Sequence, residues 1–446
     1  MAVSRFKSSS IVQGFPKFQN ASWGKRLGEY KFVHMVNNSF DLKSQGLVMG
    51  TNEYYTSGRA GTSLIVSKYA ADGSKIWSNT YQVSSATTAQ TAGGMAIDST
   101  KTYLYVVGCN PTVTNGNFIT KLNTSDGSVV WTQIISPIAD YVFMVGLDSN
   151  DNLHLQSYRD PGDSTYKTVI FGIDKNGTKM YERTITGLMT STGLVSNVVG
   201  NVITIGGFAR STYAPAGNNI LFYCIYDING NILTNKQTAS GNSDVGLFGV
   251  QDKQGYILTG GYTGSSAYTG MIHKSISDGT MIYQYNITGD ASTTVFMYGA
   301  CSDSQGNSYF TGYVNSGSTQ YAPTIFKFNA AGTLQWQRRF TAVSTSIPIN
   351  IVSVNDSYVI VNCNYGDGTY NRQVNLMLPA DGTGTGTYTV NGLTLVYAAS
   401  SATVTASSRA FSTSSLSSSA TTIYSFSSGT LTKTTASNTE TKVALA

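Results

Sequence analysis

Three histidines are the side chains best suited to catalysis or metal binding in this sequence. They are His34, His154 and His273. Each lies in a separate part of the chain, and no two of them have the spacing of paired metal ligands. We therefore expect scattered polar histidines that form no metal or catalytic centre.

The acidic pair in DSNDN, Asp148 and Asp151, resembles part of a calcium-binding loop. The segment lacks the glycine at the sixth loop position and the final glutamate that such loops use. Parallel segments elsewhere read DSTK, DKQG and DSQGN. The favoured interpretation is a turn between strands in which an aspartate caps backbone amides, with calcium binding as the alternative.

Four cysteines, Cys109, Cys224, Cys301 and Cys363, stand far apart in strand-like contexts. This spacing favours buried free thiols over a disulfide framework or a metal cluster, and it indicates synthesis in a reducing cytoplasm. The sequence also contains no GxSxG, HExxH, GxxxxGK[ST] or CxxC motif. We predict no catalytic, cofactor-binding or metal-binding residues and no enzymatic activity.

A repeated segment organises most of the chain, as in LIVSKYAADGSKIWSNTY, in which strand-like residues precede a turn glycine and an aromatic residue follows it. The turn glycines are Gly73, Gly127, Gly177, Gly230, Gly279 and Gly332. The interval between them is close to fifty residues. A regular interval of that length, built from strands, is typical of a propeller or a solenoid.

Two further strand-like segments precede each such run, a small apolar one and then one after a polar turn, which gives four strands per unit. The aromatic slot of the fourth strand recurs seven times, at Trp23, Trp77, Trp131, Tyr181, Thr234, Tyr283 and Trp336. Units of the first three strands also number seven, starting near Asn37, Ala92, Tyr141, Ser191, Ser243, Thr294 and Ser344. We predict an all-β, seven-bladed propeller with four-stranded blades over residues 18–378. The strand around Trp23 would complete the last blade and close the ring. Thr234 breaks the aromatic rule, so its blade should pack differently.

The two ends of the chain do not follow the repeat. Residues 1–17 are expected to form an extended docking arm. Residues 379–446 begin with a hairpin signal, an Asn-Gly pair between alternating residues, and continue as an extended β-type tail in which 24 of the last 46 residues are Ser or Thr. With so few large apolar side chains, the tail should be disordered in isolation and ordered by neighbouring subunits.

Charge and hydropathy exclude other classes of function. The net charge of +5 is spread along the chain without a basic run, so no nucleic-acid surface is predicted. The N-terminus shows no secretory signal, and no apolar stretch is long enough to span a membrane.

The run KLNTSDGSVVWTQ resembles the tryptophan-docking repeat of quinoprotein dehydrogenases, whose eight-bladed propellers hold pyrroloquinoline quinone. The resemblance is restricted to the docking residues Trp77, Trp131 and Trp336. Seven units, the lack of an adjacent cysteine pair and signal peptide, and the shorter chain all argue against that enzyme family. The same run is similar to non-enzymatic propeller repeats of bacterial surface and phage proteins.

The opening MAVSRFKSSSIVQGFPKFQ and the closing LPADGTGTGTYTVNGLTLVYAASSATVTASS resemble the termini of propeller-type virion proteins of tailed phages, particularly cyanophages. This resemblance implies a structural component of the virion, assembled in the host cytoplasm. We expect a tail-associated, baseplate-associated or fibre-associated interaction platform, present in multiple copies or as a symmetric homo-oligomer. Both termini would dock onto other virion proteins.

Two alternatives remain at this stage. A capsid decoration protein is a variant within the same class. A glycan-binding lectin or receptor-binding propeller belongs to another class, and it is suggested by 29 tyrosines and many polar loop residues.

Overall fold

The computed structural model describes residues 32–444 apart from internal gaps. The gaps are 37–45, 50–52, 61, 71, 84–90, 110–116, 137–139, 160–166, 187–195, 211–218, 239–243, 265–267, 290–293, 316–320, 342–345, 355, 367–370, 391–392, 410, 414–416, 421–424 and 437–439. Every regular element within the described residues is a β-strand. The predicted N-terminal arm, residues 1–17, and Trp23 lie outside the described part of the chain.

The strands form seven sheets, and six of these begin with four strands that are consecutive in sequence. The first sheet contains β2 (Gly46–Met49), β3 (Glu53–Ala60), β4 (Ser63–Ala70) and β5 (Lys75–Val83). The second contains β6 (Thr91–Ile97), β7 (Tyr103–Cys109), β8 (Asn117–Asn123) and β9 (Val129–Ser136). The third contains β10 (Asp140–Leu147), β11 (Leu153–Arg159), β12 (Lys167–Ile173) and β13 (Lys179–Thr186). The next three are β14 (Asn197–Val199), β15 (Val202–Arg210), β16 (Asn219–Asp227) and β17 (Ile232–Thr238); β18 (Asp244–Gln251), β19 (Ile257–Thr263), β20 (Thr269–Ser275) and β21 (Met281–Thr288); and β22 (Val295–Ser302), β23 (Ser308–Asn315), β24 (Tyr321–Phe328) and β25 (Leu334–Thr341).

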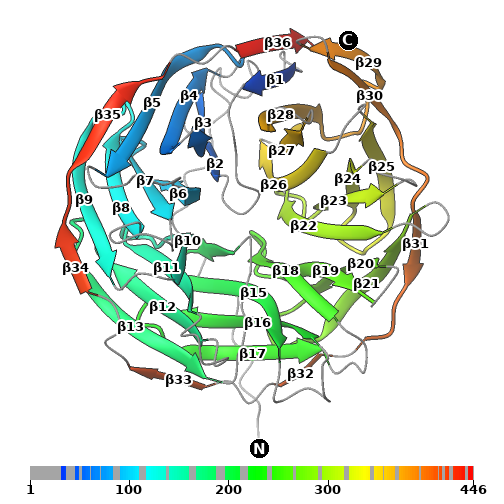
Figure 1. Ribbon diagram of the computed structural model, residues 1–446. Coiled ribbons are helices and arrows are strands. Elements are labelled where there is room, and N and C mark those ends of the chain that lie inside the picture. Colours follow the sequence, from blue (N-terminus) through cyan, green and yellow to red (C-terminus); the bar gives the residue numbers. More distant parts are fainter. Residues whose placement is uncertain are drawn as a thin grey trace, which may run out of the picture.

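The sheets are arranged around a centre as in a propeller, with the first strand of each sheet innermost (Figure 1). The prediction of an all-β propeller with four-stranded blades is confirmed. The turn glycines also agree with the predicted repeat. Positive φ values occur at all six of them, Gly73, Gly127, Gly177, Gly230, Gly279 and Gly332. Glycine is the residue that adopts this backbone conformation at little cost, so it marks the turn between the third and fourth strands.

The hydrophobic core is divided among the contacts between neighbouring sheets. One cluster joins Leu64 and Tyr81 of the first sheet to Val106 and Phe118 of the second. Another joins Tyr309 and the neighbouring strands to the sheet of β26 (Ser346–Val354), β27 (Tyr358–Gly366) and β28 (Asn371–Pro379). Each sheet thus covers the apolar faces of its neighbours, which explains why a single repeat could not fold alone.

An N-terminal strand supplies the fourth strand of the last sheet. This strand is β1 (Phe32–Val36), which pairs antiparallel with β28 from Phe32 opposite Met377 to Val36 opposite Gln373. The prediction that an N-terminal strand completes this sheet is therefore supported by β1. The predicted strand around Trp23 lies outside the described residues.

The C-terminal segment forms a strap around the outside of the propeller, which we call the belt (residues 393–444). Its strands are β30 (Leu393–Ala399), β31 (Thr403–Ala406), β32 (Phe411–Thr413), β33 (Ser417–Ala420), β34 (Ser425–Ser428), β35 (Leu431–Thr435) and β36 (Glu440–Ala444). They pair in turn with β25, β21, β17, β13, β9, β5 and β1. The belt passes from sheet to sheet in the direction opposite to the repeat (Figure 1).

The belt corrects the expectation that the tail needs neighbouring subunits to become ordered. Each propeller sheet ends in a fourth strand with an outer edge, and the chain's own tail pairs with that edge. Backbone hydrogen bonds along an edge need no separate core, so a Ser/Thr-rich segment can be ordered there. The predicted hairpin is present as β29 (Gly386–Val390) paired with β30.

Single apolar side chains of the belt enter the contacts between sheets. Leu431 belongs to the cluster of the first and second sheets, and Tyr397 belongs to the cluster next to β25. Phe411 and Phe426 contact two further clusters. The belt is thus fixed by strand pairing at every sheet and by apolar side chains at several of the crossings.

Candidate functional site

The tryptophans of the repeat join one sheet to the next. The indole Nε1 of Trp77 donates to the carbonyl of Thr124 at 3.1 Å, and Lys68 Nζ donates to the same oxygen at 3.0 Å. The same double contact recurs for Lys121 with Trp131 on Lys175, and for Lys327 with Trp336 on Ala380. Both donors reach a carbonyl beyond the third strand of the following unit. These tryptophans therefore hold sheets together and need no ligand to explain them.

Thr234 changes this contact, as the sequence predicts. A Cβ added at Gly230 would meet the Tyr181 ring of the preceding unit, whereas a Cβ added at Gly279 would meet the aliphatic stem of Lys236. Because Thr234 has no ring, the lysine stem fills the corresponding place beside the turn.

His154, Asp148 and Tyr181 form a buried polar group. The Nε2 atom of His154 lies 3.3 Å from Asp148 Oδ2, and its Nδ1 atom lies 2.8 Å from the Tyr181 hydroxyl. The side chains of His154 and Asp148 are both fully buried. Burial raises the pKa of the Tyr181 hydroxyl. With no solvent access at the imidazole, this group links strands and turns, and it offers no place for a substrate.

The other two histidines do not join this group. His273 is fully buried, and burial followed by repulsion from Arg409 lowers its pKa to about 3, so it is neutral at physiological pH. Its ring makes an edge contact with Phe411 of the belt. His34 pairs with Asn375 in the strand register, and its side chain lies outside the described set.

Asp148 and Asp151 cap turns, as the favoured interpretation predicts. Asp148 Oδ1 accepts hydrogen bonds from the backbone N–H groups of Asn150 and Asn152, at 2.8 and 3.0 Å. Asp151 accepts from the backbone N–H and hydroxyl of Ser99 in the preceding unit, at 2.7 and 2.8 Å. Both carboxylates therefore bond to donors of the protein itself.

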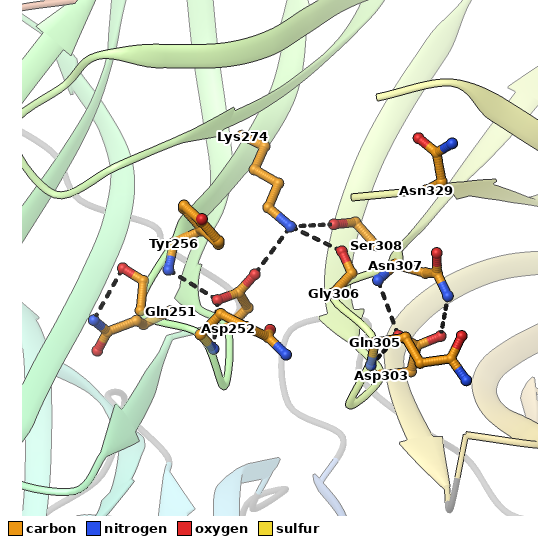
Figure 2. A network of polar contacts seen from close by, with 12 residues as sticks. Gln251, Asp252, Tyr256, Lys274, Asp303, Gln305, Gly306, Asn307, Ser308 and Asn329 are labelled. Atoms are coloured by element: carbon orange, nitrogen blue, oxygen red, sulfur yellow. Dashed lines mark hydrogen bonds and ion pairs between the residues drawn. The ribbon is translucent and has the colours of Figure 1, made fainter. Parts of the chain in front are cut away.

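Lys274 is the centre of a second buried network, shown in Figure 2. Its Nζ lies 3.1 Å from Asp252 Oδ2 and donates to the Gly306 carbonyl at 2.9 Å. The side chains of Lys274 and Asp252 have no exposed surface. The Tyr256 ring lies 4.8 Å from Nζ, and Ser308 Oγ lies 3.4 Å away. This ammonium group ties the β18–β21 sheet to the β22–β25 sheet, and Asp252 compensates its charge.

None of the four cysteines forms a disulfide, in agreement with the predicted thiols. Cys109, Cys224 and Cys363 are buried, and Cys301 is half-buried. Burial raises the pKa of the Cys224 thiol to about 12, which disfavours the reactive thiolate. Among the described residues, no three His, Cys, Asp or Glu side chains gather closely enough to hold a metal ion. The described part of the chain also has no helix that is long and apolar enough to cross a membrane.

Five aromatic side chains meet where the β18–β21 and β22–β25 sheets adjoin, and we call them the aromatic cluster. They are Tyr262 on β19, Tyr268 just before β20, Phe296 and Tyr298 on β22, and Tyr313 on β23. All except Tyr313 are partly exposed, and Tyr313 is 6% exposed. Other aromatic side chains among the described residues, such as Tyr105 and Tyr223, are instead fully buried.

The ring pairs of the cluster have two kinds of orientation, edge-on and stacked. The Phe296 ring lies edge-on to Tyr262, with centroids 4.2 Å apart and planes at 62°. Tyr268 is edge-on to Tyr262 at 4.9 Å and 75°. Tyr298 and Tyr313 are stacked at 5.7 Å and 29°. The cluster thus presents steeply inclined rings beside nearly parallel ones.

The backbone holds the cluster in place. The Tyr268 carbonyl accepts a hydrogen bond of 2.8 Å from the N–H of Val295, which joins the end of one sheet's loop to the inner strand of the next. Gly264, two residues after Tyr262, has a φ of 111°, which non-glycine residues rarely adopt. Burial, followed by the nearby Tyr268, raises the pKa of Tyr262.

Sequence reasoning does not find this cluster, because its members belong to two repeats and meet only in the fold. A signal is visible in retrospect. Tyr298 occupies the irregular point of the β22–β23 pairing, between Met297 and Gly299. The corresponding residues of two other inner strands are Val145 and Leu247. In β6 the irregular point holds Gly93 and Gly94, so the residue type in this slot varies from sheet to sheet and Tyr298 is the aromatic one among these four strands.

No family model and no curated protein matches this chain. Solved structures with a similar arrangement include the quinohemoprotein alcohol dehydrogenase ADHIIG from Pseudomonas putida HK5, with 11% identity, 81% of this chain and 69% of that chain covered, and a TM-score of 0.46. The Dos1 propeller has 9% identity, with 76% and 81% covered, and a TM-score of 0.42. The tail fiber of Staphylococcus aureus phage P68 has 8% identity, with 68% and 94% covered, and a TM-score of 0.20. These similarities assign neither an activity nor a partner to this chain.

Proposed function

We propose that this chain is a non-enzymatic structural protein of a tailed-phage virion, in which the propeller is a rigid interaction platform. The proposal counts the seven sheets as seven blades of one ring, closed by β1. Its place on the particle would be the tail, the baseplate or a fibre, with capsid decoration as the variant. The resemblance of both termini to those of phage virion proteins supports this assignment.

The observation that carries the proposal is the belt. One strand of the same chain pairs with the fourth strand of every sheet, so the belt must be detached before the sheets can separate from the outside. The belt contains no cysteine, so no disulfide holds it to the sheets. A particle protein must persist for long periods without chaperones or resynthesis, and a strap of this kind favours slow unfolding.

The belt changes how docking onto neighbours should be understood. The C-terminal tail occupies edges of its own propeller, so it is not the part of the chain that we assign to neighbouring subunits. We assign that role to residues 1–31, which precede β1 and which include the predicted docking arm. Contacts with other copies would be made through this segment and through the faces of the ring.

Particle analysis tests the proposal directly. Purified virions of the phage that encodes the chain should contain it in a fixed copy number by quantitative mass spectrometry. Antibody labelling should place it at one part of the particle in electron micrographs. A chain absent from purified particles, or one whose deletion leaves particles complete and infectious, would refute the structural role.

A second candidate function is glycan binding, either as a lectin or as a receptor-binding propeller of the same virion. The aromatic cluster favours it, because partly exposed tyrosine rings are the surfaces on which sugars stack. The two functions are compatible, since a structural platform can also contact the host surface. Binding of the full-length protein to an oligosaccharide array tests this second candidate independently of particle analysis.

A further inference from the structure

We infer that residues 1–31 of a neighbouring copy dock onto a row of exposed aliphatic side chains at the outer edges of the propeller sheets. We call this row the bulge rim, and its residues are Ile76, Val130, Met180, Leu233 and Ile282. The inference rests on the proposed function, in which residues 1–31 contact other copies. It adds the surface that receives this segment.

The bulge rim occupies one position of the repeat. In the first sheet, Lys75 and Trp77 pair with consecutive residues of β4, which leaves Ile76 as an extra residue of β5. The same irregularity falls on the rim residue of β9, β13, β17 and β21. A bulge leaves its extra residue out of the strand ladder and changes the direction of its side chain. The five side chains therefore stand at equivalent places in five sheets.

The exposed aliphatic residues are concentrated at this position. Six large hydrophobic side chains are exposed among the described residues, and five of them form the bulge rim. Leu233, at 58%, is the most exposed of the six. Isolated apolar residues are ordinary on protein surfaces, whereas exposed apolar residues that gather in one place mark interaction sites. The series is therefore better explained by a partner than by the core.

The belt leaves the bulge rim uncovered. On β5, the pairing with the belt extends to a hydrogen bond of 2.9 Å from the N–H of Ala436 to the carbonyl of Ser78, two residues after Ile76. Equivalent bonds reach Thr132 on β9 and Gln284 on β21, again two residues after the rim residue. Within the described residues, the belt thus pairs with the later part of these fourth strands. The bulge rim continues the same edges, so a second extended segment can lie alongside the belt.

Residues 1–31 are attached to the propeller at the level of this rim. Phe32, the first residue of β1, pairs with Met377 of the last sheet, and Trp336 pairs with Lys327 of the sixth. Met377 and Lys327 both stand five residues before the turn glycine of their sheet. Phe32 therefore has the register position of the aromatic residue, and Lys31 has the sequence position of the rim residue. Fully extended, 31 residues span about 100 Å, enough to reach the rim of a neighbouring copy.

The composition of the segment fits the rim. Its apolar residues include Ile11, Val12, Phe15 and Phe18, which can bury exposed aliphatic side chains. The segment also holds six of the 28 Lys and Arg residues and one of the 23 Asp and Glu residues, which leaves 22 of each sign in the rest of the chain. Residues 32–446 therefore have no net charge, and copies can approach one another without long-range repulsion.

The rim of the same copy is a less favourable place for the segment. The bulged residue of β25 is Gln335, so the apolar series is interrupted in the sheet that packs against the last one. Lys31 continues this interruption at the last sheet itself. The segment therefore leaves its own propeller at the polar part of the rim, whereas a neighbouring copy can present the apolar part directly.

The test uses full-length protein that is produced once with nitrogen-15 and once without. The two preparations are mixed, given time to exchange subunits, and treated with a short amine-reactive crosslinker. Mass spectrometry then separates crosslinks within one copy from crosslinks between a labelled and an unlabelled copy. We expect crosslinks between copies from Lys7 and Lys17 of the segment. Their partners should be Lys75 and Lys179, which directly precede two of the rim residues.

A rim variant, in which all five rim residues are replaced by serine, tests the surface. The changed positions are exposed, so the variant should fold with little loss of stability. Sedimentation equilibrium should show self-association weakened roughly a hundredfold, the loss of about two buried aliphatic contacts. Gln335→Ser, a change at the same bulge position of the sixth sheet, is the matched control and should associate like the wild type.

A wild-type protein that stays monomeric at every concentration would overturn the inference. Crosslinks of the segment that are confined to its own copy would do the same, as would unchanged association of the folded rim variant or an equal loss in Gln335→Ser. If the rim variant does not fold, the crosslinks of the wild type decide the question. None of these results changes whether purified particles contain the chain, so the proposed structural role can survive the failure of this inference.

Discussion

The ring of sheets and the belt are stabilised in different ways. In the ring, strands such as β8 and β16 are almost entirely buried, and adjacent sheets share large apolar clusters. In the belt, most side chains of β31, β34 and β35 are exposed, and the strands are held by backbone pairing and by isolated anchors such as Leu431. One chain thus combines a repeat that forms the core with a segment that is ordered without a core of its own. The ring should set the equilibrium fold, while the belt should mainly slow its opening.

Removal of the belt is the strongest way to test this division. A chain that lacks residues 386–446 should unfold in urea roughly a hundredfold faster than the full chain, because every outer strand loses its partner and the apolar anchors are lost. Stopped-flow unfolding measures the rate. A chain that lacks only β36 is the graded control and should show a small fraction of the effect. Equal unfolding rates for all three chains would show that the belt has no kinetic role.

Tyr397 tests whether single anchors hold the belt. Its side chain is 1% exposed and stacks on Phe340 with centroids 4.6 Å apart. Tyr397→Ala should reduce the free energy of unfolding by about 3 kcal/mol, as expected for the loss of a buried aromatic side chain. Thr432→Ala, an exposed change in β35, should stay within about 0.5 kcal/mol. Denaturant titration separates the two. Similar losses in both variants would mean that strand pairing alone fixes the belt.

His273 gives the contact between ring and belt a pH dependence. Its pKa is about 3 in the folded protein, against 6.5 ordinarily, so the unfolded chain takes up a proton first as pH falls. The contribution of this residue to stability is fully present above pH 6.5 and is lost as pH falls from there towards 3, at roughly 1.4 kcal/mol per pH unit. His273→Gln should remove this slope. Urea denaturation between pH 7 and pH 4 measures it, and parallel curves for the two proteins would contradict the assignment.

Trp336 should show the smallest of these effects. Its Nε1 and Lys327 Nζ both donate to the Ala380 carbonyl, each at 3.0 Å. Trp336→Phe keeps a ring at the site and leaves the lysine bond, so we expect a loss of about 1 kcal/mol. Lys327→Met should cost a similar amount, and the double variant should cost more than the sum because the carbonyl then loses both donors. Strict additivity in this double-mutant cycle would argue against a shared acceptor.

The repeat could be predicted because its signals are local. A turn glycine such as Gly127, with a positive φ, and a tryptophan four residues later identify a strand pair without reference to distant parts of the chain. The position of β1 at Phe32–Val36 and the path of the belt depend on which edges are open elsewhere, and short Ser/Thr-rich strands carry little periodicity of their own. The aromatic cluster is non-local for the same reason, since Tyr262 and Phe296 belong to different repeats and meet only after the sheets assemble.

The position of β1 between β28 and β36 has a consequence for synthesis. The strand β1 is flanked on one side by β28, the last strand of the repeat, and on the other by residues 440–444, which are translated after every strand of the ring. All strands of the ring are therefore synthesised before β36 can pair with β1. A product that terminates before residue 440 would lack the β36 strand, and the edge of β1 would remain unpaired. Proteases could cleave such a product at that exposed edge.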